Sequence, residues 1–401
     1  MLAPQTTRRR IRPGVVLLGG VVVLILLFVA ALAIGWLAAK QRVRAELARI
    51  RAAGEPVSPE DLEAFYQKPP SDRDTTQLWL DAIAALDTPE FHRDVQDVPS
   101  LTEMGEELPS VGEPWRWQPA FESLLATYHE PLEKMHRAAR LGGAARYPTN
   151  FSASYPASLP HLKQLPTCVR LLLLECELRA RQDQPSAVAD AIETMFAAGQ
   201  SIEDEPMLVS QLVRLRLDVM ARFQLERQLS NARFSDNDLA RLDRRLAAID
   251  YPASFHRAML GDRASMGYFV DPSALGPLAP NAPSALFRPV DQLVYLKSMQ
   301  KVVAAFQTSG TDLSDAVAEI EDEVAQLADE PLASLRYPIS MASFSWIQGG
   351  ATAVNQAIAG RDSARAAVAI ERLAAAWRTT DYVGRFGSRV FARSAARSVR
   401  R

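Results

Sequence analysis

The stretch 163–229 constrains the fold most, because its apolar residues recur at helical spacing in three successive segments. The first segment, 165–178, is apolar on nearly all sides, which is typical of a helix enclosed by neighbours. The second begins at Pro185, a favoured first-turn residue, and the third follows the acidic run 203–205, which suits the positive end of a helix dipole. Short polar connectors between long helices predict antiparallel neighbours. We therefore expect a core of packed helical hairpins here.

Two apolar stripes define the faces that we expect the second and third helices to bury. Their members recur mostly at steps of three and four residues, as one face of a helix requires: Val188, Ile192, Met195, Gly199 and Ile202 in the second helix, and Leu208, Leu212, Leu215, Val219 and Phe223 in the third. A second apolar row beside the later stripe predicts a wide buried face.

Several segments of the first 229 residues share short motifs with one family. They are Leu159-Pro-His-Leu162, Glu205-Pro-Met-Leu-Val-Ser-Gln-Leu-Val-Arg214, residues 51–62 and residues 128–148. On these motifs the chain resembles membrane-anchored helical proteins common in planctomycete bacteria, in which a similar segment follows a helical hairpin. The family has no assigned activity, so the resemblance implies an architecture and a membrane setting and no functional residue. The hairpin is also loosely similar to a tetratricopeptide pair, without a second clean copy.

Residues 14–39 contain no charged residue and form the predicted transmembrane anchor. As a helix they span about 39 Å, which exceeds the ~30 Å hydrocarbon core of a bilayer. A cleavable signal peptide has a shorter apolar region of about 7–15 residues, so we expect an uncleaved anchor. Basic residues flank both ends almost equally, so the positive-inside rule hardly orients the span. Because amino-terminal apolar segments commonly act as export signals, we expect the body outside the cytoplasm.

The net charge of −2 hides an acidic body between basic ends. Residues 1–51 hold nine Lys or Arg and one acid, whereas residues 52–384 carry a net charge of −16. An acidic body argues against nucleic acid as a partner. Arginines recur every four residues at the end of the chain and would form a basic stripe if a helix forms there: Arg385, Arg389, Arg393, Arg397 and Arg401. This tail would meet anionic lipid, pack on the acidic helix expected at 313–328, or fray in solvent, and fraying is the default interpretation.

Composition along the chain predicts an all-α protein in six parts. We expect a basic segment 1–13, the anchor 14–39, a helical subdomain 40–271, a proline-rich loop 272–289, a second helical subdomain 290–384 and a basic tail 385–401. Within the second subdomain, an alanine-rich pair of helices, 351–359 and 364–377, is expected to be split by Gly360-Arg-Asp-Ser363. Within the first, a helix over 119–141 is expected to be interrupted near Pro131.

Two small sets of residues are candidates for chemistry. His129, Glu133 and His136 are spaced to share one helix face and have side chains that bind metals, but a solvated polar face explains them better. Ser298 and Lys301 match a Ser-x-x-Lys pattern, although the companion motifs of penicillin-recognising enzymes are missing. Cys168 and Cys176 would lie about 12 Å apart on one helix, too far for a disulfide, and are expected in the core. We expect no cofactor.

The leading interpretation is a single-pass, membrane-anchored interaction or structural protein of the cell envelope, whose stacked helices offer grooves to protein or peptide partners. The alternative is an extracytoplasmic hydrolase that uses Ser298 and Lys301, or a metal-dependent enzyme that uses the two histidines. A third interpretation is a membrane-surface element that acts through the arginine tail.

Overall fold

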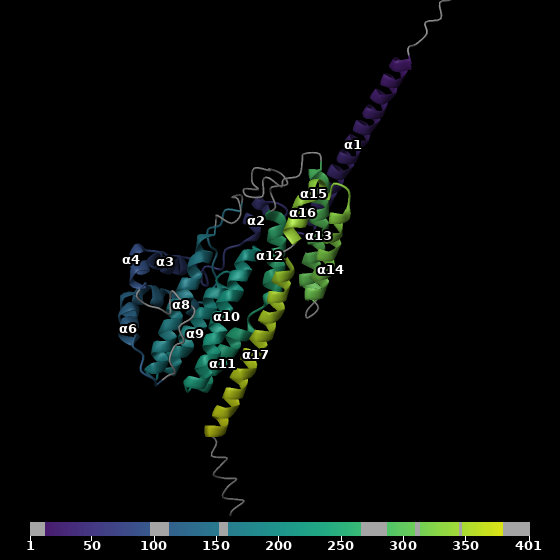
Figure 1. Ribbon diagram of the computed structural model, residues 1–401. Coiled ribbons are helices and arrows are strands. Elements are labelled where there is room, and N and C mark those ends of the chain that lie inside the picture. The colour runs from purple at the N-terminus through teal and green to yellow at the C-terminus, as the bar shows by residue number, and fades with distance from the viewer. Residues whose placement is uncertain are drawn as a thin grey trace, which may run out of the picture.

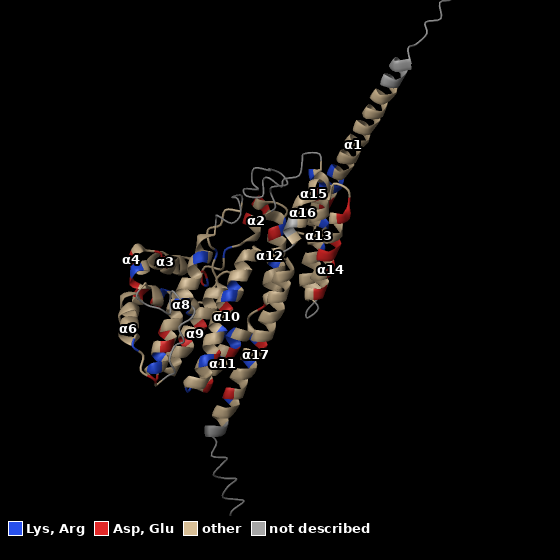
Figure 2. Cartoon of the chain, in the orientation of Figure 1, with Lys and Arg blue, Asp and Glu red and all other residues tan. Residues whose placement is uncertain are grey.

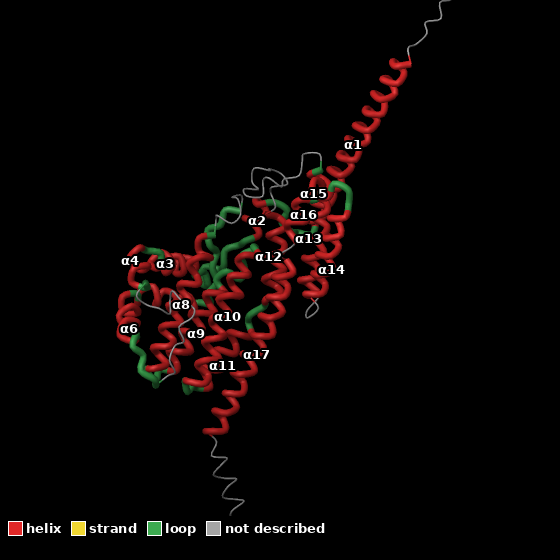
Figure 3. Tube along the Cα trace, in the orientation of Figure 1, coloured by secondary structure: helices red, strands yellow, loops and turns green. Residues whose placement is uncertain are grey.

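The computed structural model describes residues 13–96, 112–151, 159–265, 287–308, 313–344 and 347–379. Within these ranges every regular element is a helix and none is a strand, which confirms the all-α prediction (Figure 3). The basic segment 1–12, most of the proline-rich loop and the arginine tail lie outside the described residues.

The first helix, α1 (Pro13–Ala52), has two parts with different surroundings. From Gly20 onward it is long and apolar enough to cross a membrane, by length and composition, and no other helix among the described residues meets that test. Its outer part protrudes from the body and carries no charged side chain (Figure 2). Its last turns instead belong to the folded core, where Ala39, Val43 and Ile50 are buried and the helix packs against α13 (Arg288–Thr308).

Five short helices follow: α2 (Pro59–Phe65), α3 (Thr76–Leu86), α4 (Pro89–Asp94), α6 (Gln118–Thr127) and α7 (His129–Arg140). Of these, α3, α4 and α6 lie at one side of the body, whereas α2 lies beside α12 (Tyr251–Ser265) (Figure 1). The expected interruption near Pro131 is wrong by a few residues, because the chain bends at Tyr128, between α6 and α7. Pro131 lies in the first turn of α7, where its missing N–H would have had no intrahelical partner.

The three helices expected in 163–229 are confirmed. They are α8 (Pro160–Arg181), α9 (Pro185–Gln200) and α10 (Leu208–Asn231), and α9 packs against both of the others (Figure 1). The α9 stripe is buried as expected, from Val188 to Ile202.

The expected buried face of α10 is wrong. Leu212, Val219 and Phe223 are 38%, 51% and 64% exposed, and only Leu208 and Leu215 of that stripe are buried. The helix is rotated so that it buries polar side chains as well as apolar ones: Ser210, Gln211, Arg214, Asp218, Gln224 and Gln228. Each of these except Ser210 forms a hydrogen bond with a residue outside α10. These hydrogen bonds, and not the apolar periodicity, determine which face of α10 is buried.

The remaining helices complete the body. They are α11 (Asp236–Ala247), α12 (Tyr251–Ser265), α13, α14 (Leu313–Ala325), η4 (Gln326–Asp329), α15 (Ala333–Arg336), α16 (Pro338–Phe344) and α17 (Ile347–Thr379). Helices on both sides of the expected boundary 272–289 pack together, α12 against α13 and α10 against α17, and one apolar core runs from Val43 to Val368.

The expected pair of helices at the end of the body is a single helix, α17. Gly360 lies inside this helix and leaves room for Arg222, because a Cβ at this position would lie 1.3 Å from Arg222 Nη1. The next residue, Arg361, donates to the carbonyl of Ile249 at 2.7 Å, and Arg365 pairs with Asp243 at 3.0 Å. These contacts hold the helix continuous across the residues expected to end it.

Candidate functional site

A groove between α6, α7 and α8 has the composition of a recognition site. Its volume is about 470 Å³, and the buried Leu125, Leu132 and Leu178 lie among its lining residues. The polar lining comprises Glu122, His129, Glu133, His136, Glu175, Arg179 and Gln182. Apolar lining with a few convergent polar groups is typical of sites that bind a ligand or a segment of a partner.

His136 is held by hydrogen bonds on both ring nitrogens. Its Nδ1 lies 2.9 Å from Thr194 Oγ1 and its Nε2 lies 2.7 Å from Glu175 Oε2. The Thr194 hydroxyl donates its proton to the carbonyl of Asp190 at 2.7 Å, so it accepts from Nδ1–H. His136 therefore links α7 to α8 through Glu175 and to α9 through Thr194.

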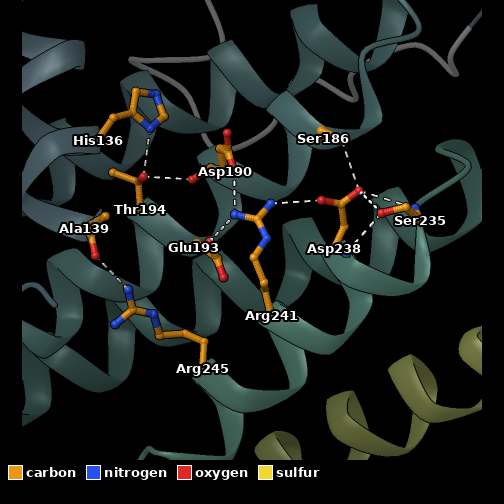
Figure 4. Close-up of polar contacts among 10 residues, drawn as sticks. All are labelled: His136, Ala139, Ser186, Asp190, Glu193, Thr194, Ser235, Asp238, Arg241 and Arg245. Atoms are coloured by element: carbon orange, nitrogen blue, oxygen red, sulfur yellow. Dashed lines mark hydrogen bonds and ion pairs between the residues drawn. The ribbon is translucent and has the colours of Figure 1, made fainter. Parts of the chain in front are cut away.

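A network of hydrogen bonds and ion pairs lies behind His136 and joins α9 to α11 (Figure 4). Arg241 Nη1 lies 2.8 Å from Asp190 and 3.0 Å from Glu193, and Nη2 lies 2.9 Å from Asp238. Asp238 also forms a capping box with Ser235 at the start of α11. Three carboxylates on one guanidinium connect the start of α11 to α9, the helix that carries Thr194, the partner of His136.

The three candidate metal ligands share the groove but are engaged separately. Nδ1 of His129 lies 3.0 Å from the carbonyl of Ala126, Glu133 pairs with Arg140 at 2.7 Å, and both nitrogens of His136 are occupied. Across the described ranges, no group of three or more His, Cys, Asp or Glu side chains could hold a metal ion together.

Ser298 and Lys301 lie on α13, far from the groove in the sequence and on a different part of the body. Ser298 is half-buried, whereas Lys301 is exposed and forms an ion pair with Glu323 of α14. A lysine that activates a serine nucleophile must instead be desolvated and directed at the hydroxyl. The pair therefore has no geometric support for nucleophilic catalysis in this conformation.

A second polar cluster, which the sequence analysis did not find, lies in the core between α8 and the turn before α10. His161 Nε2 lies 2.9 Å from Glu205 Oε2, and the two side chains are 3% and 0% exposed. The imidazole stacks on Tyr147 with ring centroids 4.1 Å apart, and the Tyr147 hydroxyl lies 2.9 Å from Ser201 Oγ. These residues lie up to 58 positions apart, so no local spacing indicated the cluster.

Two further carboxyl groups are buried at the centre of the body. Burial raises the pKa of Asp218 to about 6, although the neighbouring Arg214 favours its charged form. Burial also raises the pKa of Asp262 to about 7, against one hydrogen bond of 3.1 Å from the Leu208 N–H. Neither lines the groove, so both are features of the core and not of the candidate site.

The cysteines are buried and unreactive in this environment. Cys168 and Cys176 are both free and fully buried, as the sequence predicted, and burial raises the pKa of the Cys168 thiol to about 12. A thiol with such a high pKa carries almost no thiolate at neutral pH, and the thiolate is the reactive form.

No protein family, no curated protein and no solved structure matches the chain. The resemblance to planctomycete-type anchored proteins therefore stays a prediction. The function must be argued from the groove, the apolar helix and the way in which that helix joins the body.

Proposed function

We propose that the protein is a membrane-anchored, all-helical interaction protein of the cell envelope, with α1 as an uncleaved single-pass anchor and the body outside the cytoplasm. The observation that carries the proposal is the continuity of α1 with the core, since Val43 and Ile50 are buried in the body only a few residues after the apolar span. A helix that is part of the core is a poor candidate for removal by processing.

The groove between α6, α7 and α8 is the proposed site for a protein or peptide partner. In this view the stacked, loosely tetratricopeptide-like hairpins form a scaffold, and the groove accepts apolar side chains of the partner on Leu125, Leu132 and Leu178. Three carboxylates, those of Glu122, Glu133 and Glu175, line the groove with a single arginine, Arg179, which favours a partner segment that carries basic residues.

A site-specific cross-linker tests this assignment in the native envelope. A photoreactive residue would replace Ala126, an exposed residue that lines the groove, in the full-length chain. Ala359, exposed on α17, is the matched control position. We expect one defined adduct at 126 that weakens in the additional Glu133→Arg variant. Equal labelling at 126 and 359, or an adduct unaffected by Glu133→Arg, would contradict the assignment of the groove.

A further inference from the structure

The apolar span of α1 is joined to the folded body without a linker, so the body lies next to the end of the span. Ala39 is the last residue before Lys40, the first charge after the apolar span, and it is only 8% exposed. Val43 is buried one helical turn later, a rise of about 6 Å. If α1 spans a bilayer, as proposed above, the end of the body around Ala39 must rest on the lipid headgroups.

Contacts along α13 identify the part of the body that lies at this end. Just after α1, Glu55 pairs with Arg263 at 2.8 Å, and Arg263 also donates to Gln300 of α13 at 2.5 Å. Ala39 lies about 20 Å before the end of α1, and the start of α13 lies about 18 Å before Gln300. Because both helices run toward this shared point, Ala39 is level with the start of α13.

Helix α15 lies at the same level. The carboxylate of Asp291, in the first turn of α13, accepts from the N–H groups of Ile339 and Ser340 at 3.1 and 3.0 Å, and α15 directly precedes these residues. Helix α15 also packs against α13. Figure 1 shows α15 at the end of the body from which α1 protrudes.

This end of the body exposes two leucines in a fixed turn. Leu332 and Leu335 are 62% and 54% exposed. Leu332 has a φ of 59°, a left-handed conformation that a leucine rarely adopts and that surrounding contacts must enforce. Glu330 supplies such contacts, because its carboxylate accepts from Arg336 and from the Tyr337 hydroxyl, both at 2.8 Å.

Polar groups nearby fit the headgroup level of a membrane. On α1, the Lys40 ammonium lies 4.8 Å from the centre of the Trp36 ring, and tryptophan and lysine are typical of the membrane–water interface. Arg42 and Arg44 are exposed just below them and would face anionic headgroups. Asp329 is exposed in the turn before the leucines, which limits insertion to the boundary between headgroups and acyl chains.

We propose that the turn 329–336 is a second membrane contact of this protein. Leu332 and Leu335 insert into the headgroup–acyl boundary of the leaflet from which α1 emerges. With α1 and this turn both in contact with lipid, the tilt of the body against the membrane is fixed, and its groove is held in one orientation.

Spin labels on introduced cysteines measure this contact directly in the full-length chain. Cys168 and Cys176 are fully buried, so labelling is confined to the introduced residue. The labelled positions are Leu27→Cys in the apolar span, Leu335→Cys in the turn and Leu373→Cys on α17, which are 61%, 54% and 59% exposed. In vesicles of phosphatidylcholine and phosphatidylglycerol, the relative accessibility of each label to oxygen and to a water-soluble nickel complex reports its depth.

We expect the Leu27 label in hydrocarbon, the Leu335 label at the headgroup–acyl boundary and the Leu373 label in water, with the oxygen-to-nickel ratio several-fold higher at 335 than at 373. If the labels at 335 and 373 had the same oxygen-to-nickel ratio while the Leu27 label lay in hydrocarbon, the second membrane contact would be contradicted. The anchor would still be supported. A Leu27 label that is accessible to the nickel complex would contradict the anchor itself. Ser334→Cys, exposed beside the leucines, repeats the test with both leucines present.

Discussion

At the scale of single residues, the carboxylate of Glu205 forms hydrogen bonds with segments that are distant in the sequence. It is fully buried, lies 2.9 Å from His161, and accepts a hydrogen bond of 3.3 Å from Thr149. Its partners come from the segment before α8 and from α8 itself. Removing one member of a buried pair leaves the other without compensation, which costs far more than losing an exposed pair.

We therefore predict that Glu205→Ala lowers the free energy of unfolding by about 3–5 kcal/mol. Urea denaturation of the full-length chain in detergent, followed by circular dichroism, measures the loss. Glu63→Ala is the matched control, because Glu63 is exposed and also forms an ion pair, with Arg146. Equal denaturation midpoints for the two variants would show that the buried pair does not stabilise the fold.

A pH dependence follows from Asp262. Its folded-state pKa of about 7 lies above the ordinary value of 3.8, so the folded protein binds this proton more tightly than the unfolded chain. The stability contributed by the group is present below about pH 4 and is lost as the pH rises to about 7. A difference of about three pKa units corresponds to roughly 4 kcal/mol.

The Asp262→Asn variant isolates this effect, because its amide does not titrate and its oxygen can still accept from the Leu208 N–H. We predict that the variant gains stability relative to the natural chain as the pH rises from 4 to 7, by up to about 4 kcal/mol. Urea denaturation at a series of pH values measures the difference. Parallel pH profiles for the two proteins would contradict a proton bound at Asp262.

At this scale the sequence identified His136 as a candidate residue but did not predict its hydrogen-bond partners. Its helical face was visible from the spacing of 129, 133 and 136, whereas its partners Glu175 and Thr194 lie 39 and 58 residues away. Only the packing of α9 against both α7 and α8 brings them together. The same limit hid the pair of His161 and Glu205, because a single histidine in an apolar segment has no local signature.

At the scale of elements, α12 approaches the turn before α10 more closely than a side chain would allow. A Cβ at Gly261 would lie 1.7 Å from the carbonyl oxygen of Pro206, which is backbone and cannot move aside cheaply. Nothing lies within 4 Å of a Cβ at Gly349, which is also helical, in α17. Substitutions of the two glycines by alanine therefore separate the effect of close packing on stability from the effect of helix propensity.

We predict that Gly261→Ala displaces α12 and destabilises the protein by several kcal/mol, since overpacking typically costs about 1–3 kcal/mol and here involves backbone. Gly349→Ala should leave stability unchanged or raise it by up to about 1 kcal/mol, because alanine is the better helix former. Thermal or urea unfolding compares the two. A Gly261→Ala protein as stable as the Gly349→Ala protein would contradict the close approach.

The helices themselves were largely predictable, and their orientations were not. Periodicity located α8, α9 and α10, and a proline in the first turn marked the start of α9. It failed for the face of α10, because Arg214 and Asp218 find polar partners in the core that outweigh the exposure of Val219 and Phe223. Helix propensity also gave a wrong prediction at Gly360, where the helix continues and the glycine makes room for the side chain of Arg222.

At the scale of the whole molecule, the boundary between the proposed anchor and the body lies inside one helix, α1. The sequence predicted an anchor at 14–39 and a body from residue 40 onward. In the structure one helix crosses this boundary, and Ala39, Val43 and Ile50 are buried. If α1 crosses a bilayer, as we propose, this continuous helix sets the distance between the body and the membrane.

We predict that a chain of residues 53–401 is less stable than one of residues 37–401. Burying a Val and an Ile side chain contributes about 1.5–3 kcal/mol each, so the shorter chain should lose about 3–6 kcal/mol. Urea denaturation compares the two chains, neither of which keeps the apolar span. Equal midpoints would mean that the last turns of α1 pack on the body without supporting it.

The central claim is that α1 stays attached and holds the helical body at a membrane. Intact-mass spectrometry of the chain recovered from alkali-washed membranes tests it most directly. The account predicts a membrane-retained protein with the mass of the full chain, 44.1 kDa. A protein released into the soluble fraction, with a mass that lacks the first forty or so residues, would contradict it.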